Sequence, residues 1–255
     1  MTRTDSERYA VAVEGTTGPR ADAVAANGTG GQVTLMSDAP ISIATPAGPV
    51  SGLWNVPAAP VATLVLGHGA GAGMRHHFMA DLAAALAREG IAVLRYQFPS
   101  REAGKSRPDS PAVAAATVAA ATEVARGDYP DLPLYVGGKS FGGRMSSHAA
   151  ADGLLPGVRG LVFVGFPLHP PKRPATSRGD HLDRVRIPML FLQGTRDDLA
   201  DIDLIHQVVD RLGSAATLHE IPEADHAFSV PKRTGKLPAD VMTELATVSA
   251  RWMRR

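Results

Sequence analysis

Residues 134–144 read Leu-Tyr-Val-Gly-Gly-Lys-Ser-Phe-Gly-Gly-Arg, an apolar run that leads into a glycine-rich turn. Gly138, Ser140 and Gly142 form the pattern G-x-S-x-G, which is typical of a serine nucleophile on a sharp turn between a strand and a helix. The glycines lack side chains, so the strand and the helix can approach closely. The turn also puts the Ser140 hydroxyl at a helix N-terminus, where N–H groups favour negative charge. We expect Ser140 to be a nucleophile, and we call residues 138–142 the elbow.

Two nucleotide-binding motifs match this sequence only in part. Gly138, Lys139 and Ser140 match the end of a P-loop, but that motif requires a glycine where the chain has Pro133. Residues 67–72 match a dinucleotide-binding turn, which requires an acidic residue about 20 positions later. The next strand ends Arg-Tyr-Gln-Phe at 95–98, without a carboxylate. These departures argue against nucleotide binding, and no cofactor is expected.

Strands and helices alternate on both sides of the elbow. This alternation predicts an α/β fold with a mostly parallel sheet of about eight strands and helices on both faces. Chemistry in such sheets lies in loops at the carboxyl ends of strands. The expected strands are at 41–45, 51–56, 61–66, 91–96, 133–136, 161–164, 188–192 and 217–221. The expected helices are at 76–89, 111–126 (with Ser110 as N-cap and Gly127 just past the end), 141–151, 201–212 and 238–252.

A serine hydroxyl is a weak nucleophile and needs a base within hydrogen-bond reach. Asp197 follows the strand expected at 188–192, and His226 lies in the loop between the last strand and the last helix. The chain order serine, acid, histidine is that of hydrolases with this type of elbow. The sequence therefore predicts a triad of Ser140, Asp197 and His226, with Asp198 as the rival to Asp197.

The other histidines and acids have simpler interpretations. Asp201 and Asp203 suit the first turn of a helix, because negative charge is favoured there. A metal site made of these two residues with Asp197 and Asp198 would lack the glycine-punctuated pattern of a calcium loop. No metal is therefore expected. Five histidines are expected in polar surface roles: His76, His77, His169, His181 and His206.

The oxyanion of a tetrahedral intermediate needs about two N–H donors. One is expected from Phe141, the residue after the nucleophile. The other is expected from the Gly-rich loop after the strand at 61–66, with Ala70 as first choice and Gly71 as second. His68 is expected to brace that loop rather than take part in chemistry.

Composition excludes several other classes of protein. The 255 residues are 44% hydrophobic and 20% charged with a formal net charge of +1, which argues against nucleic acid or an anionic membrane as the main partner. The absence of cysteine excludes disulfides, thiolate zinc sites and a cysteine nucleophile. No segment reaches the roughly 18 apolar residues that span a bilayer. Arginine outnumbers lysine and alanine is abundant, which indicates a GC-rich bacterial genome.

The first 36 residues differ from the rest of the chain. They are rich in glycine, alanine, threonine and charge, without apolar periodicity, so we expect a disordered tail there and a single domain over 37–255. Translation from Met36 is an alternative explanation. A secretory signal is not expected, because no apolar run precedes a small-residue cleavage site. A cytoplasmic location is therefore expected.

Four further motifs accompany the elbow motif at 138–144. They are Gly-His-Gly-Ala at 67–70, Val-Leu-Arg-Tyr-Gln-Phe-Pro at 93–99, Gly-Lys-Ser-Arg-Pro at 104–108 and Phe-Pro-Leu-His-Pro-Pro at 166–171. With them, residues 41–255 resemble the α/β-hydrolase superfamily, and within it a small dienelactone-hydrolase-like branch of predicted hydrolases. The resemblance implies the α/β-hydrolase fold and the triad already named. Gln97 and Ser100 depart from the branch, where an acidic and an aromatic residue are usual.

We predict a serine hydrolase that cleaves a small ester, thioester or lactone through an acyl-enzyme on Ser140. The resemblance leaves open a non-catalytic subunit that binds a partner or small ligand, because the branch includes subunits of larger complexes. Lys139, Arg144 and His169 are candidates for substrate binding. For Lys139 and Arg144 the favoured interpretation is that they brace the elbow by pairing with nearby carboxylates. The Pro-rich segment 166–183 is expected to form a stiff flap, and so only a minimal cap.

Overall fold

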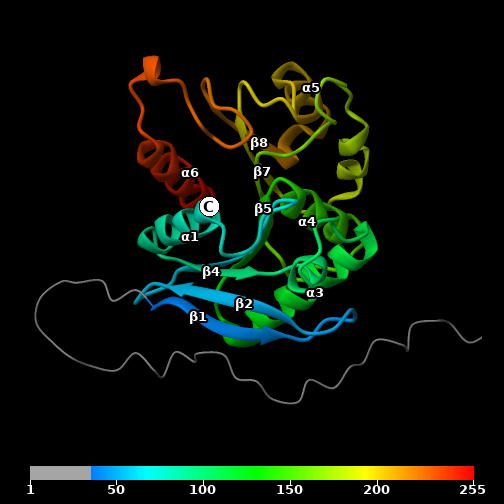
Figure 1. Ribbon diagram of the computed structural model, residues 1–255, viewed down its shortest axis with the longest axis vertical. Helices are drawn as coiled ribbons and strands as arrows, with labels where there is room; N and C mark the ends of the chain where they lie inside the picture. Colours follow the sequence, from blue (N-terminus) through cyan, green and yellow to red (C-terminus); the bar gives the residue numbers. More distant parts are fainter. Residues whose placement is uncertain (1–35) are drawn as a thin grey trace, which may run out of the picture.

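The computed structural model describes residues 36–255 (Figure 1). The strands are β1 (Met36–Ile43), β2 (Val50–Val56), β3 (Ala62–Gly67), β4 (Ile91–Tyr96), β5 (Leu134–Lys139), β6 (Gly160–Val164), β7 (Met189–Gly194) and β8 (Ala216–Ile221). The α-helices are α1 (His77–Arg88), α2 (Pro99–Glu102), α3 (Pro111–Asp128), α4 (Phe141–Ala151), α5 (Ile202–Leu212) and α6 (Pro238–Met253). Three 3₁₀ helices complete the list: η3 (Ser177–Arg184), η4 (Gly213–Ala215) and η5 (Lys232–Thr234).

All eight strands form one sheet in the order β1-β2-β4-β3-β5-β6-β7-β8. β1 and β2 are antiparallel to their neighbours, and the strands from β4 to β8 run parallel. The prediction of a mostly parallel sheet of about eight strands is therefore confirmed. The parallel arrangement brings the loops after β3, β5, β7 and β8 to the same edge of the sheet.

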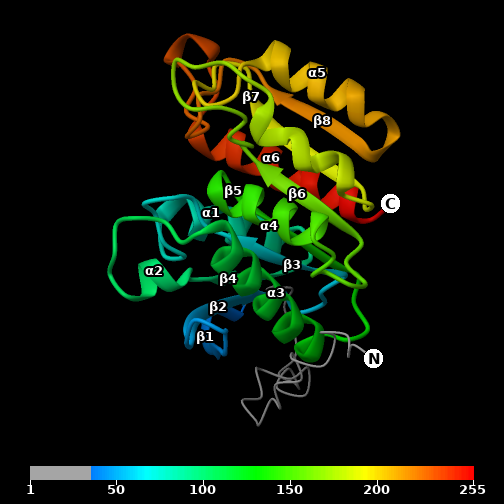
Figure 2. The ribbon, with the colours of Figure 1, turned by 90° about the vertical axis from the view of Figure 1, so that its right-hand side faces the viewer.

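Helices cover both faces of the sheet because successive side chains of each central strand point to opposite sides. In β6, Leu161 and Phe163 pack into the core under α3, α4 and α5. Val162 and Val164 pack into the other core, under α1 and α6. Figure 1 shows α1 and α6 on the left of the sheet and α3, α4 and α5 on the right. Figure 2 looks onto the side of the sheet that carries α3, α4 and α5.

The structure corrects the predicted end of the helix at 111–126. α3 continues through Gly127 to Asp128, and Tyr129 is its C-cap. The Asp128 carboxylate accepts a hydrogen bond from the Trp54 indole N–H at 3.0 Å. The Tyr129 ring packs edge-on against Trp54 at 5.0 Å. These contacts with β2 stabilise the two additional residues of the helix. Tertiary packing therefore overrides the tendency of glycine to end a helix.

The structure also corrects the start of the first strand. β1 begins at Met36 rather than at residue 41, because its pairing with β2 continues past a bulge to Val56. The prediction of a disordered tail falls on residues 1–36, which lie outside the described residues except for Met36. In the Pro-rich segment 166–183, expected to be a stiff flap, the 3₁₀ helix η3 begins at Ser177.

Candidate active site

Close packing of backbone holds the elbow between β5 and α4. Ser140 has a φ of 50° and a ψ of −112°, and such a positive φ is uncommon outside glycine. A Cβ on Gly142 would lie 2.3 Å from the Gly67 carbonyl oxygen, and one on Gly138 would lie 2.4 Å from the same atom. No real Cβ tolerates such a contact with backbone. Glycine at both positions lets α4 start directly against the end of β3, with the serine at the tip of the turn.

The three predicted triad residues lie within hydrogen-bond distance of one another. His226 Nε2 lies 2.9 Å from Ser140 Oγ. His226 Nδ1 lies 2.7 Å from Asp197 Oδ2. An ionised carboxylate can only accept, so Nδ1 carries the proton and Nε2 is left to accept the serine hydroxyl. A serine beside a base, and a base oriented by a carboxylate, can generate a nucleophile.

Asp197 is buried and fixed from three directions. Asp197 is only 5% exposed to solvent. Oδ1 accepts the Leu199 N–H at 2.8 Å, and Oδ2 accepts the Gln193 side-chain amide at 2.7 Å. The rival Asp198 is exposed. Gln193 also accepts the Phe166 N–H at 2.9 Å, and so ties the acid to the end of β6. Gln193 was not predicted from the sequence, although a polar residue near the end of an apolar strand is a signal that could have identified it.

The expected oxyanion donors lie on either side of Ser140. Phe141 is the first residue of α4, so its N–H has no acceptor within the helix. The β3–α1 loop, residues 68–76, approaches from the other side: a Cβ on Gly69 would lie 3.7 Å from the Ser140 Cβ. Ala70 and Gly71 follow in this loop, and Gly71 has a positive φ of 75°. The arrangement puts the backbone of both segments next to the nucleophile.

Three side chains clamp the β3–α1 loop. The first is His68, whose Nδ1 lies 2.8 Å from the Gly69 carbonyl oxygen and whose Nε2 accepts the Phe98 N–H at 3.1 Å. Burial lowers the pKa of His68 to about 4, so the imidazole is neutral near pH 7 and can accept that hydrogen bond.

The other two clamps, Arg95 and Gln97, hold Met74 near the end of the same loop. Arg95 is 1% exposed and donates to the Met74 carbonyl at 2.8 Å. Its guanidinium also bonds to Asn55 and Asp38. Gln97 Oε1 accepts the Met74 N–H at 2.9 Å. Neither residue was predicted from the sequence to hold this loop.

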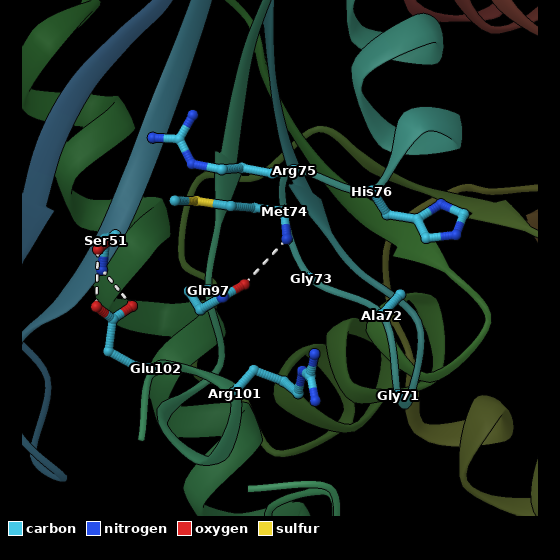
Figure 3. A pocket seen from close by; sticks show the side chains of 10 residues that line it. All are labelled: Ser51, Gly71, Ala72, Gly73, Met74, Arg75, His76, Gln97, Arg101 and Glu102. Carbon is cyan, nitrogen blue, oxygen red and sulfur yellow. Dashed lines mark hydrogen bonds between the residues drawn. The ribbon is translucent and has the colours of Figure 1, made fainter. Parts of the chain in front are cut away.

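A cavity of about 470 Å³ opens beside the β3–α1 loop (Figure 3). Gly71 lies on its wall, two residues after the glycine that contacts Ser140. Polar and charged groups dominate the rest of the wall, including Gln97, Arg75 and Arg101. Glu102, also on the wall, is held by the Ser51 N–H and hydroxyl at 3.0 and 2.8 Å. The cavity is therefore a polar space beside Gly71, and its wall includes neither Ala70 nor Phe141.

The candidates for substrate binding, Lys139 and Arg144, do not pair with carboxylates. No ion pair involves either residue within residues 36–255, so the favoured interpretation of carboxylate pairing is wrong. Lys139 Nζ instead donates to the His226 carbonyl oxygen at 2.7 Å. Arg144 Nε is buried without a partner in the described residues. Burial and the nearby Arg178 lower the pKa of Arg144.

The third candidate, His169, is 3% exposed rather than on the surface. Its Nε2 accepts the Asp201 N–H at 2.8 Å, and its Nδ1 lies 2.9 Å from the Pro170 carbonyl oxygen. The segment after β6 folds against the loop before α5, where the His169 N–H also bonds to the Leu199 carbonyl. Because backbone groups engage both ring nitrogens, His169 ties these two loops together.

Residues 36–255 contain no group of three or more histidine, cysteine, aspartate or glutamate side chains placed to hold a metal ion. Over the same range, every helix is too short or too polar to cross a bilayer.

Comparison with known proteins gives one family match. A model of the alpha/beta hydrolase domain family matches residues 60–254, which include the elbow, the acid and the histidine.

Solved structures with a similar fold include several hydrolases. A lidless α/β serine hydrolase from Xanthomonas campestris is 26% identical, with a TM-score of 0.68 over 87% of this chain and 97% of that one. A dienelactone hydrolase from Anabaena variabilis is 19% identical, with a TM-score of 0.67 over 88% and 98% of the two chains. An esterase domain from Rhodothermus marinus is 17% identical, with a TM-score of 0.64 over the same shares.

Proposed function

This chain belongs to the alpha/beta hydrolase domain family, and we propose that it is a serine hydrolase that cleaves small esters, thioesters or lactones. The observation that carries the proposal is the continuous set of contacts from Asp197 through His226 to Ser140, at 2.7 and 2.9 Å. A fold that only bound a partner would not need a buried carboxylate aligned with an imidazole and a serine on a strained turn. The proposed reaction is an acyl transfer, first to Ser140 and then to water.

The reaction begins with attack of Ser140 Oγ on the substrate carbonyl carbon. His226 Nε2 takes the hydroxyl proton, and Asp197 stabilises the imidazolium that forms. The carbonyl oxygen becomes an oxyanion, which accepts hydrogen bonds from the N–H of Phe141 and of Ala70, with Gly71 as the alternative donor. His226 then gives its proton to the leaving oxygen or sulfur, and the acyl group stays on Ser140.

The second half of the reaction regenerates the serine. His226 takes a proton from a water molecule, and the resulting hydroxide attacks the acyl carbon. The acid leaves and the proton returns to Ser140 Oγ. His226 accepts or donates the proton in each transfer. The proposed mechanism therefore needs no cofactor. For a lactone, the leaving oxygen stays in the same molecule as the acid.

No triad residue lines the polar cavity beside the β3–α1 loop, but we propose that the acyl group extends along this loop from Ser140 into it. Its wall carries Arg75, Arg101 and Gln97, and a long alkyl chain would desolvate these groups without replacing their hydrogen bonds. We therefore expect short or polar acyl groups, and p-nitrophenyl acetate should be turned over faster than p-nitrophenyl octanoate.

The proposed function is tested by hydrolysis of p-nitrophenyl acetate by wild type, Ser140→Ala, His226→Ala and Asp197→Asn. Each variant should lose about four orders of magnitude or more in kcat, because the three groups act as one unit. Circular dichroism should show a wild-type fold. Turnover that persists in purified Ser140→Ala would contradict the proposal.

A further inference from the structure

Lys139 directly precedes the nucleophile but bonds to the loop that carries the base. That loop, residues 222–229, is called the histidine loop. Lys139 Nζ donates to the His226 carbonyl oxygen at 2.7 Å. One side chain therefore connects the end of β5, which positions Ser140, with the backbone of the residue that must reach it.

An aromatic and backbone cage surrounds the Lys139 ammonium. Nζ lies 5.4 Å from the Phe228 ring centre and 5.9 Å from that of Phe78, distances at which a cation is attracted to an aromatic face. The two rings stack on each other at 5.9 Å. On another side, a Cβ on Gly165 would lie 3.1 Å from Nζ, so glycine there leaves room for the ammonium. The Lys139 residue is half-buried, and its ammonium lies against the two rings, the His226 carbonyl and Gly165.

The histidine loop is a tight turn whose own hydrogen bonds, such as those of the Asp225 and Phe228 N–H groups, do not engage the His226 carbonyl. Asp225 Oδ1 accepts the Ala227 and Ser229 N–H groups, both at 2.9 Å. Phe228 has a positive φ of 63°, which is unfavourable for a bulky residue. The hydrogen bond from Lys139 holds the His226 carbonyl, and so opposes rotation of the peptide that carries the imidazole.

We propose that Lys139 is a positioning residue, whose charged side chain holds the histidine loop so that His226 stays aligned between Asp197 and Ser140. The inference rests on the proposed hydrolase function. It replaces a substrate-binding role for Lys139, because the ammonium already bonds to the His226 carbonyl and lies against the Phe78 and Phe228 rings. Loss of the charge should misalign the base and slow chemistry, with substrate binding unchanged.

The charge of Lys139 can be lost within an accessible pH range. Burial lowers the pKa of Lys139 to about 8, while the carboxylates of Asp197 and Asp225 act in the opposite direction. The ammonium is present below this pH and is lost as the pH rises through it. A neutral amine makes a weaker hydrogen bond to a carbonyl and has no cation–π attraction. Alignment of the base should therefore weaken above about pH 8.

The test compares wild type, Lys139→Met and Lys139→Arg in kcat, KM and the rate of fluorophosphonate labelling from about pH 6 to about pH 10. Methionine keeps the length and apolar stem without the charge, and arginine keeps the charge at high pH. We expect Lys139→Met to lose about ten-fold in kcat at pH 7 with KM within about two-fold, because a displaced base impairs chemistry alone. Wild type should lose kcat above pH 8. That decline should be absent in Lys139→Met and shifted upward in Lys139→Arg.

Three results would overturn the inference. A raised KM with unchanged kcat in Lys139→Met would assign the residue to substrate binding. An unchanged kcat in Lys139→Met would show that Lys139 does not position the base. A wild-type kcat that stays constant from about pH 8 to about pH 9.5 would contradict the dependence on the Lys139 charge, even without a variant. Wild-type turnover is the reference, so its absence would refute the proposed hydrolase instead. Thermal midpoints check that each variant folds.

Discussion

The elbow and the β3–α1 loop face each other across the active site, but they are fixed by different means. In the elbow, backbone packs on backbone: Gly138 and Gly142 lie against the Gly67 carbonyl with no room for a Cβ. In the β3–α1 loop, side chains from β4 and the residues after it hold the backbone, through Arg95 and Gln97. The difference teaches that a steric constraint between backbone segments can be recognised from a short sequence motif. A loop held by side chains depends instead on residues that are distant in the sequence.

Breaking the elbow should have the largest effect. In Gly142→Ala the new Cβ would lie 2.3 Å from the Gly67 carbonyl oxygen, so β3 or α4 must move. We expect a loss of about 3 kcal/mol or more in the free energy of unfolding, together with loss of activity. Urea denaturation and p-nitrophenyl acetate turnover measure the two effects.

Gly127→Ala is the matched control for that substitution. Gly127 lies in α3 with no atom within 4 Å of an added Cβ. Alanine should stabilise this helix by about 0.5–1 kcal/mol, because glycine is a poor helix former. Equal effects of Gly142→Ala and Gly127→Ala would refute the steric account of the elbow.

Removing a clamp should have an intermediate effect. Gln97→Leu leaves the buried N–H of Met74 without its acceptor, which should lower the free energy of unfolding by about 1–3 kcal/mol. Because the same loop supplies an oxyanion donor in the proposed mechanism, kcat should fall while KM changes less. Gln97→Glu keeps an oxygen at the same position and should retain most of the activity. A larger loss in the glutamate variant than in the leucine variant would contradict the clamp.

Substitution at the exposed part of the same loop should have the smallest effect. Gly71 has a φ of 75°, but an added Cβ would meet no atom within 4 Å. Gly71→Ala should therefore lower the free energy of unfolding by about 1 kcal/mol, the conformational cost of alanine at positive φ. A thermal midpoint lowered as far as in Gly142→Ala would show that this loop is packed as tightly as the elbow.

The same distinction explains what could be predicted from sequence. The elbow pattern and the alternation of apolar strands with helices led to the fold and to Ser140. Asp197 and His226 could be named because they follow strand ends in a parallel sheet, whose loops meet at one edge. Each of these inferences needs only local sequence and a topological rule.

The missed features all depend on contacts between distant segments. Gln193 supports Asp197 by bridging to the end of β6. His169 is buried because its two nitrogens join loops that only the fold brings together. α3 continues beyond Gly127 because Trp54 donates a hydrogen bond to Asp128, the last residue of the helix. Residue type alone cannot identify such partners, since the same side chains also suit the surface.

The most direct test of the central claim is treatment of the protein with a fluorophosphonate, followed by mapping of the adduct by mass spectrometry. The triad geometry predicts a single adduct on Ser140 that forms in wild type and is absent in Ser140→Ala. An adduct on another residue, one that persists in Ser140→Ala, or none on folded wild type would contradict an activated serine at the elbow.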